Sequence, residues 1–205
     1  TWILWGWNEQ GYMVTAFLIS TRFLLVSRLG VQLTIRTPTG KVHHLAKEYT
    51  MDKVKGKTKK LYLKVAGKHW WDGGLKKGVV HVDYGKWGCH LKYQRVITGY
   101  RHMNGSMRFG SSVFTGITFG PRLSLQGTVR IDGKKIKFRG VGYADYSLQT
   151  ITPKNLAQRW YAARAMDKEY TVLAHHLLTV KKWKPMSLPG ISIAKNNRWM
   201  FISLP

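Results

Sequence analysis

The chain has 205 residues, which fits one large or two small domains. Hydrophobic residues make up 44% and aromatic residues 13%, enough for a packed core, which excludes a disordered chain. The 34 lysines and arginines against 9 acids give a formal net charge of +25, which favours an anionic partner over a basic face that only meets solvent. The single cysteine, Cys89, excludes an intrachain disulfide and a cysteine-based zinc cluster.

No apolar run reaches the length of a membrane-spanning helix, and no signal or transit peptide is visible. The chain begins with Thr1 rather than Met. We therefore expect either a removed presequence or a chain that starts inside a longer product. The compartment stays open, and a peripheral membrane location, an organelle or the periplasm fits this beginning.

Apolar residues recur mostly with a period of two, which is typical of strands with two different faces. Asp132-Gly133 and Asn196-Asn197 stand between alternating runs and predict tight hairpin turns, and residues 38–40 predict another turn. Together these signals predict an all-β protein, an antiparallel sandwich or barrel with at most one short helix. The expected strands lie within residues 31–46, 60–71, 79–97, 129–141, 169–180 and 191–204.

One segment, residues 152–170, is compatible with a helix. Thr152 can cap it and Pro153 suits the first helical position, but a loop that enters a strand over residues 159–165 fits equally well. The lysine-rich segment 51–60 is expected to be a mobile loop between two strands.

The segment 106–120 is rich in glycine, serine and threonine and is expected to connect two halves of the chain. It suggests two β-domains, residues 1–115 and residues 116–205.

The motif Gly140-Val-Gly-Tyr143 superficially resembles a phosphate-binding loop. A dinucleotide fingerprint needs a third glycine and a βαβ unit, and neither is present here. In a β-context, glycines more often mark a bulge or a close approach of two backbones. We therefore predict a structural role for Gly140 and Gly142.

The order of several weak motifs resembles a known superfamily. Pro121-Arg122, a Gly-x-Val motif, the G-x-G-Y block, an aromatic–arginine block and a strand with Tyr-Thr follow one another over residues 121–179. This order resembles the lipocalin-like superfamily of carotenoid 1,2-hydratases, AttH-type proteins, fungal Diels–Alderases and yeast survival-factor proteins. Residues 147–160 look most like the survival-factor branch, and residues 1–41 resemble the opening strands of the superfamily.

The resemblance implies two consecutive lipocalin-like β-domains, often with an apolar cavity. It also implies that the G-x-G-Y block is a strand corner. In the hydratase and Diels–Alderase branches an Asp-His pair follows the tyrosine. Here Asp145 matches the acid, but Tyr146 replaces the histidine, so the acid–base pair is incomplete.

The histidines do not predict a metal site. His43-His44 and His175-His176 are neighbours whose side chains point to opposite faces of a strand, so neither pair chelates locally. His81 and His90 are further candidates with few carboxylates to accompany them. Cys89 and His90 also diverge on a strand, which argues against an activated thiol. We predict no metal and no cofactor.

The nine tryptophans either pack the cores or line an apolar ligand pocket. On β-periodicity Trp5 and Trp7 share a face, and Trp2 lies opposite. The predicted pocket residues are Trp5, Trp7, Tyr12, Trp71, Tyr143, Asp145, Trp160 and Tyr161. The predicted contacts to an anionic partner are Lys53, Lys55, Lys57, Lys59, Lys60, Lys134, Lys135, Lys181 and Lys182.

Three functions compete at this stage. The first is a noncatalytic protein that binds or carries a hydrophobic molecule, a lipid above all, and docks on anionic membrane. The second is a structural subunit of a ribonucleoprotein or membrane complex, with protein or nucleic-acid partners. The third is an isomerase, cyclase or hydratase that acts on a hydrophobic substrate, with Asp145 and either Tyr143 or Tyr146 in the pocket.

Overall fold

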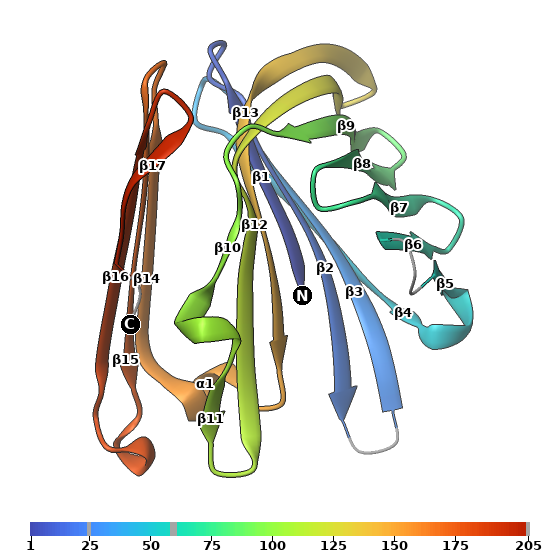
Figure 1. The fold of residues 1–205 in the computed structure, drawn as a ribbon. Helices are drawn as coiled ribbons and strands as arrows, with labels where there is room; N and C mark the ends of the chain where they lie inside the picture. Colours follow the sequence, from blue (N-terminus) through green and yellow to red (C-terminus); the bar gives the residue numbers. More distant parts are fainter. Residues whose placement is uncertain (24–25, 58–60, 204–205) are drawn as a thin grey trace. The chain divides into compact units, whose positions relative to one another are not determined.

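A computed structural model describes residues 1–23, 26–57 and 61–203 (Figure 1). Strands make up 74% of the structure, and they form one antiparallel sheet that nearly closes into a barrel and a second, smaller sheet. The prediction of an all-β protein with at most one short helix is confirmed, since the described ranges contain one α-helix, α1 (Pro153–Leu156). No helix among these residues is long and apolar enough to cross a membrane.

Residue contacts divide the chain into two units, each built from two stretches of sequence. The first contains Thr1–Val96 and Arg122–Asp145, and the second contains Ile97–Pro121 and Tyr146–Pro205. Two long strands, β12 (Ser112–Ile131) and β13 (Lys134–Gln149), run through both units. Residue 115 lies inside β12, and the division into domains 1–115 and 116–205 stays a prediction.

The large sheet has the strand order β4-β3-β2-β1-β13-β12-β9-β8-β7-β6-β5. Its two ends, β4 and β5, follow each other in the chain and are joined by the short 3-10 turn η1 (Met51–Lys53). The remaining strands of this path are β1 (Trp2–Asn8), β2 (Met13–Phe23), β3 (Val26–Arg36), β4 (Val42–Thr50), β5 (Val54–Lys57), β6 (Leu61–Val65), β7 (His69–Gly73), β8 (Lys77–Tyr84) and β9 (Trp87–Arg95).

The interior of the first unit follows from the alternation of its strands. Leu4 pairs with Ala16, which pairs with Leu33, so the three side chains share one face of β1, β2 and β3 (Figure 1). All three are at most 1% exposed. Removing such apolar surface from water contributes about 25 cal/mol per Å². The period-two pattern therefore fixes which side of each strand faces the core.

Both predicted hairpin turns are confirmed. Asp132 and Gly133 have φ of 48° and 82°, and Asn196 and Asn197 have φ of 48° and 64°. Two consecutive residues with positive φ make the turn type whose twist matches that of the paired strands, and Asn, Asp and Gly tolerate this backbone best. These turns join β12 to β13 and β16 (Ser187–Lys195) to β17 (Arg198–Ser203).

The lysine-rich segment 51–60 differs from the expected mobile loop. Residues 51–53 form η1, and residues 54–57 form β5, which pairs with β6. Residues 58–60 lie outside the described residues. The strand preference of lysine is only weakly unfavourable, and the ladder hydrogen bonds to β6 outweigh it. The expectation is wrong for the described part of this segment.

The segment 106–120, expected to be a connection, is mostly strand. β11 (Met107–Phe109) pairs with the start of β12 in the register Met107↔Phe114, and β10 (Tyr100–Arg101) pairs with β12 further along. Every second residue of this part of β12 is buried, including Phe114 and Thr118. Small polar residues between them pair as well as larger ones, so a linker-like composition misled the prediction.

The segment 152–170 contains both of the structures that its sequence allows. Pro153 begins α1 as the helix reading predicts, while Thr152 holds the N-cap position without the predicted side-chain hydrogen bond. The helix ends after one turn, and β14 (Ala157–Met166) follows, as the strand reading requires. Pairing with β15 (Tyr170–Thr179) outweighs the helix preference of the alanines.

Gly140 and Gly142 lie inside β13, next to β1, and not in a loop. A Cβ at residue 140 would collide with the carbonyl oxygen of Trp7, and one at residue 142 with that of Trp5. Only glycine allows the two strands to approach this closely. The predicted structural role of the G-x-G-Y block as a close backbone approach is confirmed.

The second unit contains the four-stranded sheet β14-β15-β16-β17, which Figure 1 shows as four neighbouring strands. Buried side chains from the β11–β12 hairpin, from α1 and its preceding turn and from β15 form one hydrophobic cluster. Its members are Phe109, Phe114, Ile151, Leu156 and Leu177. This cluster joins the β11–β12 hairpin to the small sheet, and η2 (His102–Gly105) precedes that hairpin in the chain.

Candidate functional site: a buried imidazole cluster

The predicted pocket residues are divided between the units, six in the first and two in the second. In β1 the buried face carries Leu4 and Gly6, so Trp5 and Trp7 lie on the opposite face and Trp2 shares the face of Leu4. The burial pattern agrees with the prediction that Trp5 and Trp7 share one face of the strand and that Trp2 lies on the other. Both Trp5 and Trp7 are half-buried.

Trp71 fills the barrel interior and does not border an open space. It is 1% exposed, and its ring centroid lies 5.8 Å from that of Trp2. Its Nε1 donates a 3.0 Å hydrogen bond to the hydroxyl of Tyr93. Of the two roles that the sequence allowed for the tryptophans, core packing or pocket lining, the burial of Trp71 fits core packing.

The remaining predicted pocket residues differ in burial and belong to both units. Tyr12 is half-buried just before β2, Tyr143 is 5% exposed in β13, and Asp145 is half-buried two residues later. Trp160 and Tyr161, neighbours in β14, are 48% and 55% exposed. Trp160 meets Phe114 edge to face at 5.5 Å, while Tyr161 stacks with His176. The pocket assignment stays a prediction.

The predicted anionic contacts are exposed lysines on separate elements. Lys53 pairs with Asp52 at 3.1 Å, and Lys55 and Lys57 extend from β5. Lys134 and Lys135 begin β13. In η3 (Lys181–Trp183), the ammonium of Lys182 lies 5.0 Å from the Trp183 ring centroid. Lys59 and Lys60 lie outside the described residues.

A cluster of titratable side chains in the second unit is absent from the sequence prediction. His102, at the start of η2, forms a 2.8 Å hydrogen bond between its Nε2 and Oγ1 of Thr118 in β12. Its ring centroid lies 5.1 Å from that of Tyr100. The Tyr100 hydroxyl accepts a 3.3 Å hydrogen bond from Ser192 of β16. These contacts orient the His102 ring and the Tyr100 hydroxyl.

His175 in β15 completes the cluster. Its ring meets that of His102 edge to face, with centroids 5.1 Å apart. Its Nε2 is buried and has no hydrogen-bond partner among the residues that the structure describes. An unsatisfied buried polar atom costs about 1–3 kcal/mol, so it calls for a partner from outside the chain. The residue as a whole is only half-buried.

The strand partner of His175 is Gly190. The ring lies so close over this glycine that a Cβ at position 190 would collide with its Cε1 and Nε2. The absence of a side chain at residue 190 therefore makes the room in which the imidazole lies. The Trp199 ring packs edge to face against Tyr100, with ring centroids 5.5 Å apart. Its Nε1 donates a hydrogen bond to the carbonyl oxygen of Thr98.

The electrostatics keep both imidazoles neutral. Burial, together with His175 and the charge of Arg164, lowers the pKa of His102 to about 4. Burial also lowers the pKa of His175, again helped by Arg164. A neutral imidazole can accept a proton at one nitrogen and donate one from the other. Arg164 in β14 adds a permanent cation beside the two rings.

The sequence carried only a weak signal for this cluster. His175 attracted attention as half of an adjacent pair, and the expectation that the pair diverges agrees with the structure, since His176 bonds Ser187 and stacks with Tyr161 instead. His102 and Tyr100 lie in a stretch without regular alternation. They join His175 only because β10 and η2 fold against the small sheet.

The other histidines form no metal centre among the described residues. His43 stacks on Trp87 with centroids 4.0 Å apart, while its neighbour His44 bonds Thr34. His81 and His90 lie side by side across β8 and β9, with their Nδ1 atoms 3.3 Å apart. Cys89 is buried, and burial raises the pKa of its thiol to about 12, so it is no nucleophile.

No protein-family model and no curated protein sequence matches the chain. Solved structures do match. Kievitone hydratase from Nectria haematococca superposes with a TM-score of 0.70 at 11% identity over 93% of this chain and 60% of its own. An AttH-like protein from Nitrosomonas europaea superposes with a TM-score of 0.67 at 15% identity, over 94% of this chain and 63% of its own. CghA superposes with a TM-score of 0.62 at 10% identity, over 100% of this chain and 59% of its own.

These neighbours are consistent with the predicted lipocalin-like superfamily, and identities this low show the fold alone. The chain spans about three fifths of the length of these structures. The expectation of a noncatalytic lipid-binding protein is corrected, because an enzyme, kievitone hydratase, is among the neighbours over nearly the whole chain.

Proposed function

We propose that the chain is part of an enzyme that transfers protons on a hydrophobic small molecule, as a hydratase, isomerase or cyclase does. The observation that carries the proposal is the His175 Nε2, a buried nitrogen without a hydrogen-bond partner among the described residues. The fold that the chain shares with kievitone hydratase supports it. The activity, substrate and partners of the whole protein are part of this proposal.

In this proposal His175 is the proton-transfer group. A substrate oxygen or a water molecule at Nε2 would supply the missing hydrogen bond. Because its lowered pKa keeps the ring neutral at pH 7, Nε2 can accept a proton that leaves the substrate or an attacking water. In a hydration, the water oxygen then bonds to one carbon of the double bond, and the proton is returned to the other carbon.

The neighbours of His175 have supporting roles. His102, held by Thr118, packs edge to face against the His175 ring and fixes its tilt. The Tyr100 hydroxyl is positioned by Ser192 and can donate its proton to a substrate oxygen. Arg164 stabilises negative charge that develops on that oxygen, and such electrostatic stabilisation is often the largest catalytic contribution.

Tyr143 and Asp145 remain a second proposal, based on the family resemblance. Asp145 has the place of the acid in the Asp-His pair of the hydratase branch, and Tyr146 replaces the histidine. The likeness of residues 147–160 to the survival-factor branch also stays a proposal, as do a membrane, nucleic-acid or protein partner and the compartment.

The test is substrate turnover by the full chain. Kievitone and a panel of hydrophobic enones are incubated with the protein in D₂O, and the products are analysed by mass spectrometry and NMR. Hydration adds one water to the mass, and isomerisation introduces deuterium at carbon. We expect His175→Gln to lower the rate by about 10²–10⁴-fold, the usual contribution of a general acid or base.

A matched control is His44→Gln, because His44 lies on the surface of the first unit and bonds only Thr34 among the described contacts. It should keep the wild-type rate. Wild-type turnover in His175→Gln, with native circular dichroism, would rule out the proposed role of His175.

A further inference from the structure

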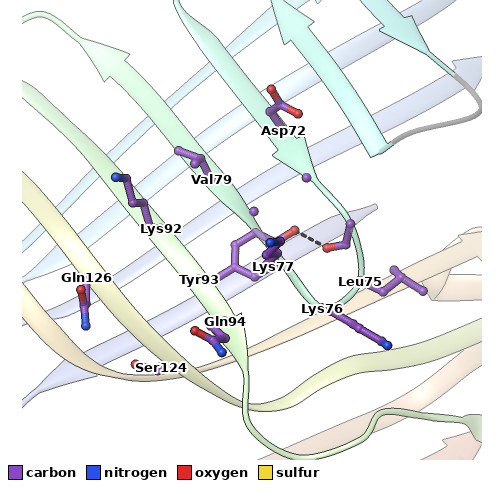
Figure 2. Close-up of a pocket in the computed structure, with 13 residues that line it drawn as sticks. Asp72, Leu75, Lys76, Lys77, Val79, Lys92, Tyr93, Gln94, Ser124 and Gln126 are labelled. Carbon is purple, nitrogen blue, oxygen red and sulfur yellow. Dashed lines mark hydrogen bonds between the residues drawn. The ribbon is translucent and has the colours of Figure 1, made fainter.

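A groove of about 820 Å³ lies on the first unit, over β7, β8, β9 and β12 (Figure 2). Its volume falls within the range of small-molecule sites, roughly 300–1,000 Å³. It lies on the outward face of these strands, because their inward residues Val80, Leu91 and Leu125 are at most 1% exposed. The groove is therefore separate from the packed interior of the barrel.

The strand register aligns polar side chains across this groove. Lys77 pairs with Gln94, which pairs with Ser124, and one step along the strands Lys92 pairs with Gln126. Figure 2 shows Lys92, Gln94 and Gln126 extending from neighbouring strands on this face. Lys77 and Lys92 are diagonal neighbours, about 7–8 Å apart at their backbones, a separation that two long side chains bridge easily. Two ammonium groups can thus reach one ligand.

The charge of the groove is positive. Lys76, Lys77 and Lys92 line it together with one acid, Asp72. Gln94, Gln126 and Ser124 add neutral donors and acceptors between the lysines. Lysines of like charge on adjacent rungs repel one another, and an oxyanion between them removes that repulsion.

The rim of the groove is held rigidly. The turn after β7 is fixed by the bonds Gly74 N–H to Lys77 O and Arg95 N–H to Lys76 O, both 2.7 Å. The Tyr93 hydroxyl donates a 2.8 Å bond to the Gly74 carbonyl, drawn dashed in Figure 2, while accepting from Trp71 of the core. This chain of bonds ties the rim to the barrel interior.

Glycine makes this arrangement possible. A Cβ at Gly78 would approach the Tyr93 hydroxyl to 2.5 Å, and one at Gly73, where φ is +146°, would collide with the backbone of Gly78. Glycine at residues 73 and 78 therefore has a local structural reason. A rim that is already ordered loses little conformational freedom when a ligand binds.

We propose that this groove binds a small polyanion, a phosphate ester or a multicarboxylate, between Lys77 and Lys92. Gln94, Gln126 and Ser124 hydrogen-bond the remaining oxygens of the ligand. This site lies in the first unit, goes beyond the proton-transfer function proposed for the second unit, and does not depend on it.

The test is isothermal titration calorimetry of the full chain with pyrophosphate and with citrate at constant ionic strength. We expect saturable binding of one anion per chain. The double variant Lys77→Gln, Lys92→Gln should weaken it by about tenfold or more, since it removes two charge-assisted contacts. Tighter pyrophosphate binding points to phosphate esters, and tighter citrate binding points to multicarboxylates.

The control has to distinguish binding at this groove from the nonspecific attraction of anions to a chain with a net charge of +25. The double variant Lys41→Gln, Lys86→Gln removes the same charge from exposed positions of the same unit and should change the affinity by less than about twofold. Equal weakening by the two double variants, or no effect of either, would overturn the proposal. Tyr93→Phe keeps the charge and removes the rim bond, and we expect it to weaken binding by about threefold.

Discussion

The imidazole of His175 lies directly over Gly190, its partner across β15 and β16, in a position that any side chain at residue 190 would block. The ring is thereby held against the strand, and its Nε2 is buried. Its centroid lies 5.1 Å from the centroid of the His102 ring. One missing side chain thus sets the geometry of the proposed proton-transfer group.

Gly190→Ala is expected to displace the His175 ring. The new Cβ would overlap the ring, and such overpacking costs about 1–3 kcal/mol. Turnover should fall by about tenfold or more, with a loss of stability measured by urea denaturation. Gly56→Ala is the control, because its Cβ would meet its nearest atom at 3.4 Å, in ordinary contact. An unchanged rate in Gly190→Ala would contradict the role of this contact.

His175 and Asp145 are rival catalytic residues, and two variants separate them. If the imidazole cluster performs the chemistry, His175→Gln lowers turnover by about 10²-fold or more, and Asp145→Asn leaves it within about threefold. The opposite pattern would support the assignment from the family resemblance. Rates should be measured at equal folded fractions, established from the near-ultraviolet circular dichroism of each variant.

Stability should fall on acidification because buried histidines must take up protons. Burial lowers the pKa of His69 to about 4, below its ordinary value of 6.5. Between these values the unfolded chain binds a proton that the folded chain does not. The contribution of His69 is therefore complete above about pH 6.5 and is lost as the pH falls toward 4.

The structure gives a reason for the neutral state of His69. Its Nδ1 accepts a 3.1 Å hydrogen bond from the backbone N–H of Asp83, and its Nε2 lies 2.8 Å from the Tyr49 hydroxyl. Protonation at Nδ1 would break the first bond. We expect the urea midpoint to drop between pH 7 and pH 5, with a shallower drop in His69→Gln. An equal drop in the variant would show that other groups cause it.

Gly142→Ala tests the close approach of β13 and β1. Its Cβ would collide with the Trp5 carbonyl oxygen and approach the Leu125 side chain to 2.5 Å, so we expect a loss of about 2 kcal/mol or more. Gly74→Ala is a fair comparison for stability, since nothing lies within 4 Å of its Cβ, and it should stay within about 0.5 kcal/mol of wild type. Thermal unfolding of both variants measures the two stabilities, and an equal stability of the two would contradict the prediction.

Local signals predicted the strands well. Alternation at Val31, Leu33 and Ile35 indicated which residues face the core, and the Asp-Gly and Asn-Asn pairs indicated hairpin turns. Such signals depend on interactions between near neighbours, which the sequence displays directly. Composition misled where it was used in place of periodicity, since segments 51–57 and 106–120 look like linkers and are largely strands.

The candidate site could not be predicted in the same way. Its members Tyr100, His102, Thr118, His175 and Ser192 come from four separate stretches, and no spacing in the sequence relates them. Burial, which keeps the imidazoles neutral, also depends on what packs against them. The pocket assignment stays a prediction, in which Trp71 is buried and Tyr161 is 55% exposed.

The sequence by itself determined the all-β class, the facing of the strands and the structural role of the glycines in Gly140-Val-Gly-Tyr143. These follow from the period of two and from backbone sterics, which act over a few residues. Only the tertiary structure decided which polar groups meet: the His175–His102 contact, the polar rungs around Lys77 and Lys92, and the bonds that fix their rim. Such groups are distant in the chain, and strand register and packing alone bring them within a few ångströms of each other.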